Sequence, residues 1–330
     1  KNQIKAVVTN PYNIIVLIAV VLLVYLIVLP LLDMIATTFE LAQRDIRAVG
    51  GGKAGDFTLY YWQRLLASEL SWTMLIKPLI NSLVIGVCVS VCAILLGSIL
   101  AWLMVRSDLP FKKFFSLAVI IPYMIPSWTK ALAWLAMFRN STSGANGFLA
   151  GMGIPIPDWL AYGPIAIVLC MSMHYYAFSY IMVSGALRSI NSELEEMGEI
   201  QGASKAQILR HITLPLILPS VLSATVMTIS KSIGTYGVPA NLGNRIGYYT
   251  LATKMRNFID QGPQAVGYAM SIVLVLLAAV IIFSNQRIVG VRKSYATVSG
   301  KGGRATLMPL GKAKKPLMAF LMVFLFLAMV

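Results

Sequence analysis

The chain has 330 residues, of which 58% are hydrophobic and 12% charged, and its mean hydropathy is +0.77. Soluble domains carry roughly twice that share of charged residues, so the composition excludes an ordinary soluble protein. The net charge of +15 does not indicate a nucleic-acid binder, because the basic residues fall mostly in loops between apolar segments. The sequence therefore predicts an all-α integral membrane protein.

Several apolar segments are long enough to cross a membrane, since a hydrocarbon core of ~30 Å needs about 20 helical residues. The predicted spans are Tyr12–Thr38, Pro78–Val105, Phe114–Phe138, Pro164–Leu187, Leu214–Ile233 and Gly267–Ile288. The second carries Ala93, Gly97 and Ala101 at four-residue spacing, a seam on which another helix can pack closely. Pro122 and Pro126 in the third predict a helix buried in a bundle, where neighbours satisfy the freed carbonyl groups.

The distribution of basic residues favours a cytoplasmic N-terminus, mainly because the segment after the sixth span is rich in lysine and arginine. We expect residues 1–11 in the cytoplasm, a six-span domain over residues 12–290 and a basic cytoplasmic linker over residues 291–316. Residues 317–330 are expected to begin a seventh span. Because half a span cannot cross a bilayer, the chain is expected to be the first half of a longer protein.

The two long loops on the opposite side are expected to differ in character. Leu59–Leu70 carries Tyr60, Tyr61 and Trp62, which are typical of a helix lying at the membrane interface. Asn140–Gly163 is rich in serine, glycine and proline and predicts an irregular connection.

A glutamate-rich stretch between the fourth and fifth spans predicts two short helices at the membrane surface. Ser192 precedes Glu195 by three residues, which is the spacing of a capping box, and Gly202 is placed to end the first helix. Ser204 and Gln207 form a second capping box that opens the next helix.

The spacing from Glu196 through Gly202 to Ile212, Leu214 and Pro215 resembles the EAA loop of permease subunits of bacterial type I ABC importers. In that family the loop, here residues 189–215, seats in a cleft of the ATPase subunit as a coupling helix. The resemblance implies these ATPase-coupling residues: Glu195, Glu196, Glu199, Gly202, Ala203, Ile212, Leu214 and Pro215. The chain departs from the motif where its two alanines are replaced by Met197 and Gly198.

The same resemblance implies a MetI-like six-helix bundle in the bacterial cytoplasmic membrane that works by alternating access. The implied partners are a cytoplasmic ABC ATPase dimer, an extracytoplasmic solute-binding protein and a second permease half, which is fused or separate. The lipid bilayer surrounds the bundle, and no nucleic acid is involved. The sequence has no GxxxxGK[ST] phosphate loop, so we expect no enzyme activity and no cofactor in this chain.

Two further segments bear on the solute. Ser232–Gly243 resembles the FGxPxxLG segment of permeases for ferric iron, polyamines and related substrates, and its glycines and proline predict irregular backbone. Tyr295–Gly303 resembles the linker of fused ferric-iron-type permeases. Ferric iron is therefore the first expectation, with an organophosphonate or phosphate ester, or a polyamine, as the alternatives.

Lys130 and Lys231 are cations inside predicted spans, where a charge is expensive and generally faces a bundle interior or a cavity. They either line the path of an anionic solute or snorkel to the outer boundary. If both face a lumen, a phosphonate is favoured over a cation. The residues expected to form the path and outer gate are Lys130, Lys231, Tyr236, Gly237, Pro239, Pro122 and Pro126.

An ion-driven carrier that uses these lysines is the alternative from another class. Such carriers generally contain inverted repeats with broken helices, which the predicted spans do not show. No metal site is expected, because Cys88, Cys92 and Cys170 lie in apolar runs without completing ligands. His174 lies beside Tyr175 and neighbouring tyrosines, a pattern more typical of packing than of iron ligation.

Overall fold

The computed structural model describes residues 11–141, 144–290 and 307–329, and the regular structure in this part of the chain is helical apart from two isolated β-bridges. The contacts divide the chain into two compact units. The first comprises Lys1–Ile76 and Lys254–Val273, and the second comprises Lys77–Thr253 and Leu274–Val330. The second unit contains the residues that the sequence analysis singles out for coupling and for the path.

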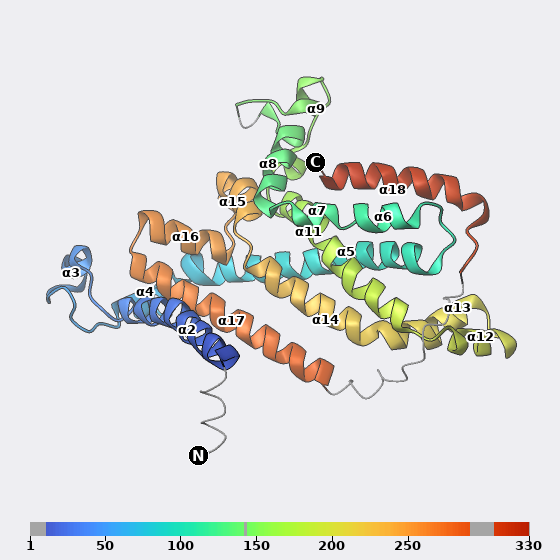
Figure 1. Cartoon of the computed structure of the whole chain (residues 1–330). Helices are drawn as coiled ribbons and strands as arrows, with labels where there is room; N and C mark the ends of the chain where they lie inside the picture. The colour runs from blue at the N-terminus through green and yellow to red at the C-terminus, as the bar shows by residue number, and fades with distance from the viewer. Residues whose placement is uncertain (1–10, 142–143, 291–306, 330) are drawn as a thin grey trace, which may run out of the picture. The chain divides into compact units, whose positions relative to one another are not determined.

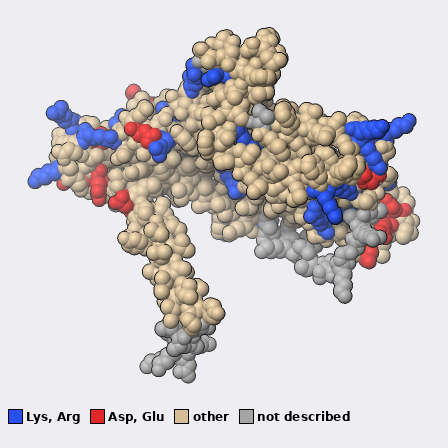
Figure 2. Space-filling model, turned by 45° about the horizontal axis from the view of Figure 1, so that its top comes forward, with Lys and Arg blue, Asp and Glu red and all other residues tan. Residues whose placement is uncertain are grey.

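Among the described residues, five helical segments are long and apolar enough to cross a membrane. The corresponding helices are α2 (Pro11–Thr37), α5 (Lys77–Arg106), α11 (Pro164–Ser189), α14 (Leu214–Ile233) and α17 (Gln264–Gly290). They match five of the predicted spans to within a few residues. On the face shown in Figure 2, uncharged residues form most of the surface and the charged side chains gather in a few clusters.

The third predicted span is broken instead of being one continuous helix, and it makes a sixth span if the bent pair is counted as one. It consists of α6 (Lys112–Ala118), α7 (Ile121–Met124) and α8 (Ser127–Phe138), with a bend of 94° between α7 and α8. Ile125, which precedes Pro126, has ψ 130° and is extended, because the proline ring disfavours the helical region for the residue before it. Pro122 lies in the first turn of α7, where the missing N–H removes no helical hydrogen bond.

In the second unit, α5, α11 and α14 pack side by side (Figure 1). Gly97 permits the close approach of α5 and α11, because a Cβ atom there would lie 2.7 Å from the carbonyl oxygen of Tyr176 and from the Cβ of Ser179. Ala93 and Ala101 are fully buried, so the predicted seam of small residues is confirmed.

The residues expected to begin a seventh span belong to α18 (Lys314–Met329), which packs on this same unit near α6 and α7 (Figure 1). Leu321 and Phe324 are buried, and the rings of Phe324 and Tyr176 meet edge to face with centroids 5.0 Å apart. Most of the predicted basic linker, and the whole of Tyr295–Gly303, lies outside the described residues.

The predicted interfacial helix is shorter than expected, since α4 covers Tyr60–Leu66. Tyr61 is fully buried instead of facing the interface; its hydroxyl donates to Asp45 Oδ2 at 2.9 Å and accepts the Ala42 N–H at 3.0 Å. This first unit also contains α3 (Ile46–Val49) and a π-helical turn over Trp72–Ile76.

The remaining connections contain short helices. These are α9 (Phe148–Gly151), α10 (Asp158–Ala161), α12 (Ser192–Ile200), α13 (Lys205–Ile208), α15 (Gly237–Gly243) and α16 (Leu251–Gln261). Helix α15 replaces the irregular backbone predicted for this part of Ser232–Gly243. Its Pro239 lies within the first turn, where a missing N–H leaves the helical hydrogen bonds intact.

Candidate coupling loop and membrane cations

Helix α12 begins one residue earlier than the predicted capping box requires. Its N-cap is Asn191, whose Oδ1 accepts the backbone N–H of Glu193 at 3.1 Å, and whose amide donates to Glu193 Oε2 at 2.9 Å. Ser192 is the first helical residue, so its proposed role as the cap is wrong. Asparagine at the N-cap satisfies an N–H that the helix itself leaves free.

The turn between α12 and α13 has the predicted chemistry. Gly202 adopts φ +82°, the left-handed conformation that ends many helices and that glycine adopts at the lowest cost. Ser204 and Gln207 form the predicted capping box, with the Ser204 N–H donating to Gln207 Oε1 at 2.8 Å and the Gln207 N–H to Ser204 Oγ at 3.3 Å. The loop is therefore two helices joined by an elbow at Gly202.

A π-helical turn, Leu209–Thr213, joins α13 directly to α14. Helix α12 packs on this segment through Gly198, where an added Cβ would lie 3.2 Å from Ile208 Cγ1 and from Ile212 Cδ1. Glycine in place of the motif's alanine therefore fits a close contact between the two arms of the loop.

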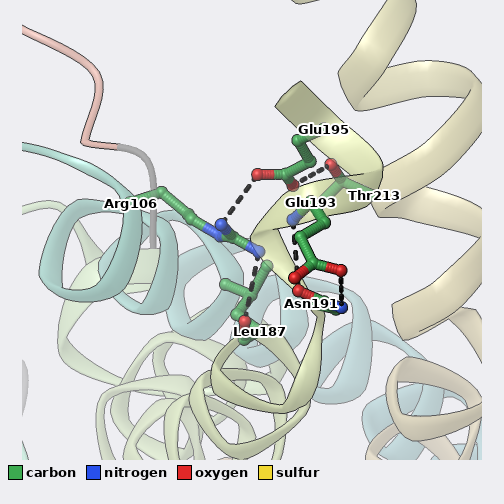
Figure 3. Close-up of polar contacts among 6 residues, drawn as sticks. All are labelled: Arg106, Leu187, Asn191, Glu193, Glu195 and Thr213. Carbon is green, nitrogen blue, oxygen red and sulfur yellow. Dashed lines mark hydrogen bonds and ion pairs between the residues drawn. The ribbon is translucent and has the colours of Figure 1, made fainter. Parts of the chain in front are cut away.

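Glu195 lies on the inner face of α12 and joins three helices (Figure 3). Its Oε2 accepts a hydrogen bond from Arg106 Nη1 at 2.7 Å, and its Oε1 accepts one from Thr213 Oγ1 at 2.8 Å. Arg106 ends α5, and its Nη2 also donates to the carbonyl oxygen of Leu187 on α11 at 3.3 Å. We call Arg106, Leu187, Glu195 and Thr213 the Glu195 joint.

The joint is shielded from water, since the side chains of Arg106 and Glu195 are 5% and 12% exposed. Removing one partner of a buried ion pair leaves an uncompensated charge, which makes such a joint sensitive to single substitutions. The sequence analysis did not select Arg106 or Thr213. One signal was available, because Arg106 is the charged residue that closes the apolar run of α5.

The outer face of α12 is exposed and carries both apolar and acidic side chains. Leu194, Met197 and Ile200 are 45%, 60% and 86% exposed, and Glu196 and Glu199 are exposed beside them. The structure thus separates Glu195, which points inward, from Glu196, which points outward, while Glu199 is exposed at the edge of the cavity behind the loop. Of the other predicted coupling residues, Gly202 and Ala203 form the elbow, Ile212 packs inward, and Leu214 and Pro215 are exposed at the start of α14.

A cavity of about 340 Å³ lies behind the loop, between it and the end of α5. Trp102, Arg106, Glu195 and Ile208 contribute to its wall, together with Leu307 and Met308 from the segment before α18. The exposed Glu199 of α12 also lines this cavity, which therefore opens beside the joint.

The segment before α18 is tied to the residues that follow α5. The Met308 N–H donates to the Arg106 carbonyl at 2.8 Å, and Asp108 Oδ1 accepts the Leu310 N–H at 2.8 Å. Lys314 Nζ lies 2.6 Å from Asp108 Oδ2. The hydrogen bond from Lys314, followed by that from Leu310, lowers the pKa of the Asp108 carboxyl below its ordinary value. We call Leu307–Lys314 the strap.

The two membrane cations lie on different helices, and both adjoin the same part of α11. Lys130 on α8 is 4% exposed and donates to the carbonyl oxygen of Met173 at 2.8 Å. Lys231 on α14 is exposed, and its ammonium lies 5.4 Å from the centre of the Phe178 ring. Snorkelling therefore does not describe Lys130, whose ammonium is buried.

The other predicted gate residues lie around α8 and α15. A Cβ on Gly237 would lie 2.6 Å from the Cβ of Trp128, so glycine allows α15 to approach α8 closely. Pro239 is buried and Tyr236 is 44% exposed. Pro126 marks the break between α7 and α8.

The described residues contain no group of three or more histidine, cysteine or acidic side chains that could hold a metal ion. The ring of His174 packs between Tyr123 and Tyr175, with centroid distances of 5.1 and 5.0 Å. His211 is exposed, and its Nδ1 lies 3.1 Å from the Gln207 carbonyl.

The described part of the chain is thus a bundle of helices long and apolar enough to cross a membrane, with a capped surface loop fastened to the helix ends. Residues 93–293 match the family model of the binding-protein-dependent transport system inner membrane component. The chain belongs to this family, and it has the all-α permease fold of type I ABC importers. Subunits of this kind are not themselves enzymes.

Three relatives illustrate the range of the family. The chain is 30% identical over 210 residues to PhnV of Salmonella typhimurium, a permease protein named for 2-aminoethylphosphonate transport; the match covers 64% of this chain and 73% of PhnV. It is 26% identical to the galactooligosaccharide permease protein GanP of Bacillus subtilis, over 56% of this chain and 43% of GanP. It is 30% identical to a permease protein of Marchantia polymorpha named for sulfate transport, over 43% and 47% of the two chains.

Two solved structures have the same fold. A bacterial ABC transporter involved in the import of the acidic polysaccharide alginate matches with a TM-score of 0.63 at 18% identity, over 84% of this chain and 94% of that chain. The inward-facing methionine transporter MetNI matches with a TM-score of 0.54 at 21% identity, over 68% and 98%.

Proposed function

We propose that this chain forms one half of the translocation path of an ATP-driven importer and that its loop over residues 189–215 transmits force from a cytoplasmic ATPase. The observation that carries the proposal is the division of α12 into two faces. Glu195 fastens the inner face to α5 and to the entry of α14, whereas Leu194, Met197 and Ile200 are exposed apolar side chains among glutamates. Exposed apolar side chains grouped in this way are typical of a surface that binds a partner.

The Glu195 joint connects movement of α12 mechanically to α5 and α14. An ATPase that displaces α12 would also move Arg106 at the end of α5 and Thr213 at the entry to α14, because both donate hydrogen bonds to the Glu195 carboxylate. Because the ion pair is buried and short, it resists separation, so the two helix ends follow α12. We propose that this movement opens and closes the path between the permease halves.

The proposed partners are an ABC ATPase dimer, an extracytoplasmic solute-binding protein and a second permease half. The family model, which describes binding-protein-dependent transport, supports the first two and favours an ATP-driven importer over an ion-driven carrier. A cytoplasmic N-terminus is proposed as well, because basic residues are dense in the segment after the sixth span.

We propose a small oxyanion, in the class of phosphonates and sulfate, as the solute. The names of PhnV and of the Marchantia relative support this class, while GanP shows that the family also contains sugar permeases. Ferric iron, the first expectation from the sequence, has no specific support from the relatives. Lys130, Lys231 and the contact of Gly237 with Trp128 are proposed as parts of the path and gate.

The test is a substitution on the outer face of α12. Ile200→Asp should abolish co-purification of the cognate ATPase and ATP-driven uptake, because it places a charge on an 86% exposed apolar position without touching the joint. Phe57→Asp is the matched control, since Phe57 is 75% exposed but lies in a loop proposed to face outward. ATPase binding by Ile200→Asp at the wild-type level would refute the docking role.

A further inference from the structure

This inference rests on the proposed importer function and concerns a cluster of residues that the coupling loop does not include. Tyr123 on α7, Lys130 on α8, His174 on α11 and Lys231 on α14 converge where the third span breaks. We call these four residues the cationic cluster. Discontinuous helices and intramembrane charges are both typical of sites that handle ions or polar solutes.

Lys130 is the least compensated member of the cluster. The residue is 4% exposed, and its ammonium has one hydrogen bond in the described structure, to the carbonyl oxygen of Met173. An ammonium carries three donors. The sequences of α7, α8, α11 and α14 contain no aspartate or glutamate, so no carboxylate on these helices can neutralise it.

His174 adds a second unsatisfied group. The residue is 8% exposed, and its Nδ1 is a buried atom without a hydrogen-bond partner among the described residues. The ring is fixed between the aromatic rings of Tyr123 and Tyr175. A buried polar atom without a partner carries a desolvation cost, so its position calls for a ligand or a water molecule.

Lys231 is held over the cluster from α14. Its own carbonyl accepts a hydrogen bond at 3.3 Å from the hydroxyl of Tyr175, which connects the end of α14 to α11, and a local one at 2.9 Å from the hydroxyl of Thr235. Its ammonium lies over the face of Phe178, whose ring centroid is 6.2 Å from that of Tyr123. Cations within membrane helices generally face protein or a polar cavity, although Lys231 lies in the last turn of α14, where a lysine can also reach the interface.

We propose that the cationic cluster is a transient binding site for a divalent oxyanion, a phosphonate or sulfate group, on its way through the membrane. Lys130 and Lys231 supply two positive charges that match the dianion, and the hydroxyl of Tyr123 offers a further hydrogen bond. An occupying anion would offset the cost of keeping an unpaired ammonium buried. A cationic solute would be repelled by the same two charges.

The experiment measures thermal protection of the purified permease complex in lipid nanodiscs at constant ionic strength. The probes are sulfate, 2-aminoethylphosphonate, the neutral sugar galactose and the cation spermidine. The variants are Lys130→Met and Lys231→Gln, with Lys130→Arg retaining the charge and Lys113→Met removing an exposed lysine of α6 outside the cluster.

We expect one of the two oxyanions, and neither of the other probes, to protect the wild type and Lys113→Met. Loss of one lysine charge should raise the oxyanion concentration needed for half-maximal protection about tenfold or more. Lys130→Arg, which keeps the charge, should retain most of the protection. If Lys130→Met does not fold, Lys231→Gln at its exposed position carries the test alone.

Absence of oxyanion protection in the wild type, or equal protection in Lys231→Gln, would overturn the site. Either result leaves the importer function intact, because the effect of Ile200→Asp on ATPase binding is read without any solute. Conversely, wild-type ATPase binding by Ile200→Asp together with oxyanion protection would refute the docking role of α12 but support the anion-binding site.

Discussion

The Glu195 joint makes a quantitative prediction about two residues far apart in the sequence. Arg106 and Glu195 are 89 positions apart, and their charged groups meet at 2.7 Å in a buried setting. Replacing each by methionine, singly and together, tests whether the ion pair itself fastens the loop. Methionine keeps much of the volume, so the substitution removes charge with little loss of packing.

Each single substitution leaves one buried charge without its partner, which costs about 3–5 kcal/mol for buried pairs. The double variant removes both charges and leaves mainly the Thr213 hydroxyl without its acceptor, at about 1 kcal/mol for a lost neutral hydrogen bond. We therefore expect the double variant to be more stable than either single variant, the reverse of additive behaviour.

The assay is thermal unfolding of the purified permease, measured in the same detergent for all variants. Glu196→Met is the matched control, because Glu196 is exposed on the same helix one residue away. We expect it to lie within about 0.5 kcal/mol of the wild type. Additive losses in the double variant, or single losses as small as that of Glu196→Met, would refute the assignment of the joint.

Four further substitutions test other contacts. Gly97→Val should lower stability by about 1–3 kcal/mol, measured in the same assay, because even a Cβ would meet α11 at 2.7 Å. Gly237→Ala should impair uptake with normal ATPase binding, since its Cβ would meet Trp128 at 2.6 Å; normal uptake would exclude a gating contact. Gly202→Val should cost about 1–3 kcal/mol through its φ of +82° and reduce uptake per ATP hydrolysed. Asp108→Lys should release the strap to limited proteolysis, and adding Lys314→Glu should restore protection; no restoration would mean that the ion pair is incidental.

The sequence predicted most of the helices because apolar length and capping are local properties. Local sequence predicted the ends of α5 and α14 and the capping box at Ser204. The Ser192 cap was misplaced because Asn191 competes with it at the adjacent position and asparagine is an equally good cap.

The break in the third span was missed because proline in a membrane helix is compatible with either a bend or a continuous helix. Two prolines in close succession, with Ile125 forced to extend, decide in favour of the break. Similarly, α15 was predicted as irregular because its glycines were counted as breakers, whereas Gly237 serves a close contact with Trp128.

The candidate site could be predicted only in part. Spacing identified the loop, but it could not say that Glu195 turns inward while Glu196 faces outward, because that depends on which distant helix supplies an arginine. The contact of Lys130 with α11 is likewise a tertiary property that the α8 sequence alone does not contain.

The most direct test of the central claim is the number of solute molecules imported per ATP hydrolysed by the complete complex in proteoliposomes. Glu195→Gln keeps the side-chain shape and an acceptor for Thr213 but removes the charge that holds Arg106. We predict that this variant retains ATPase binding and ATP hydrolysis while its import per ATP falls at least several-fold. An import ratio for Glu195→Gln equal to that of the wild type would contradict the claim that Glu195 transmits the stroke.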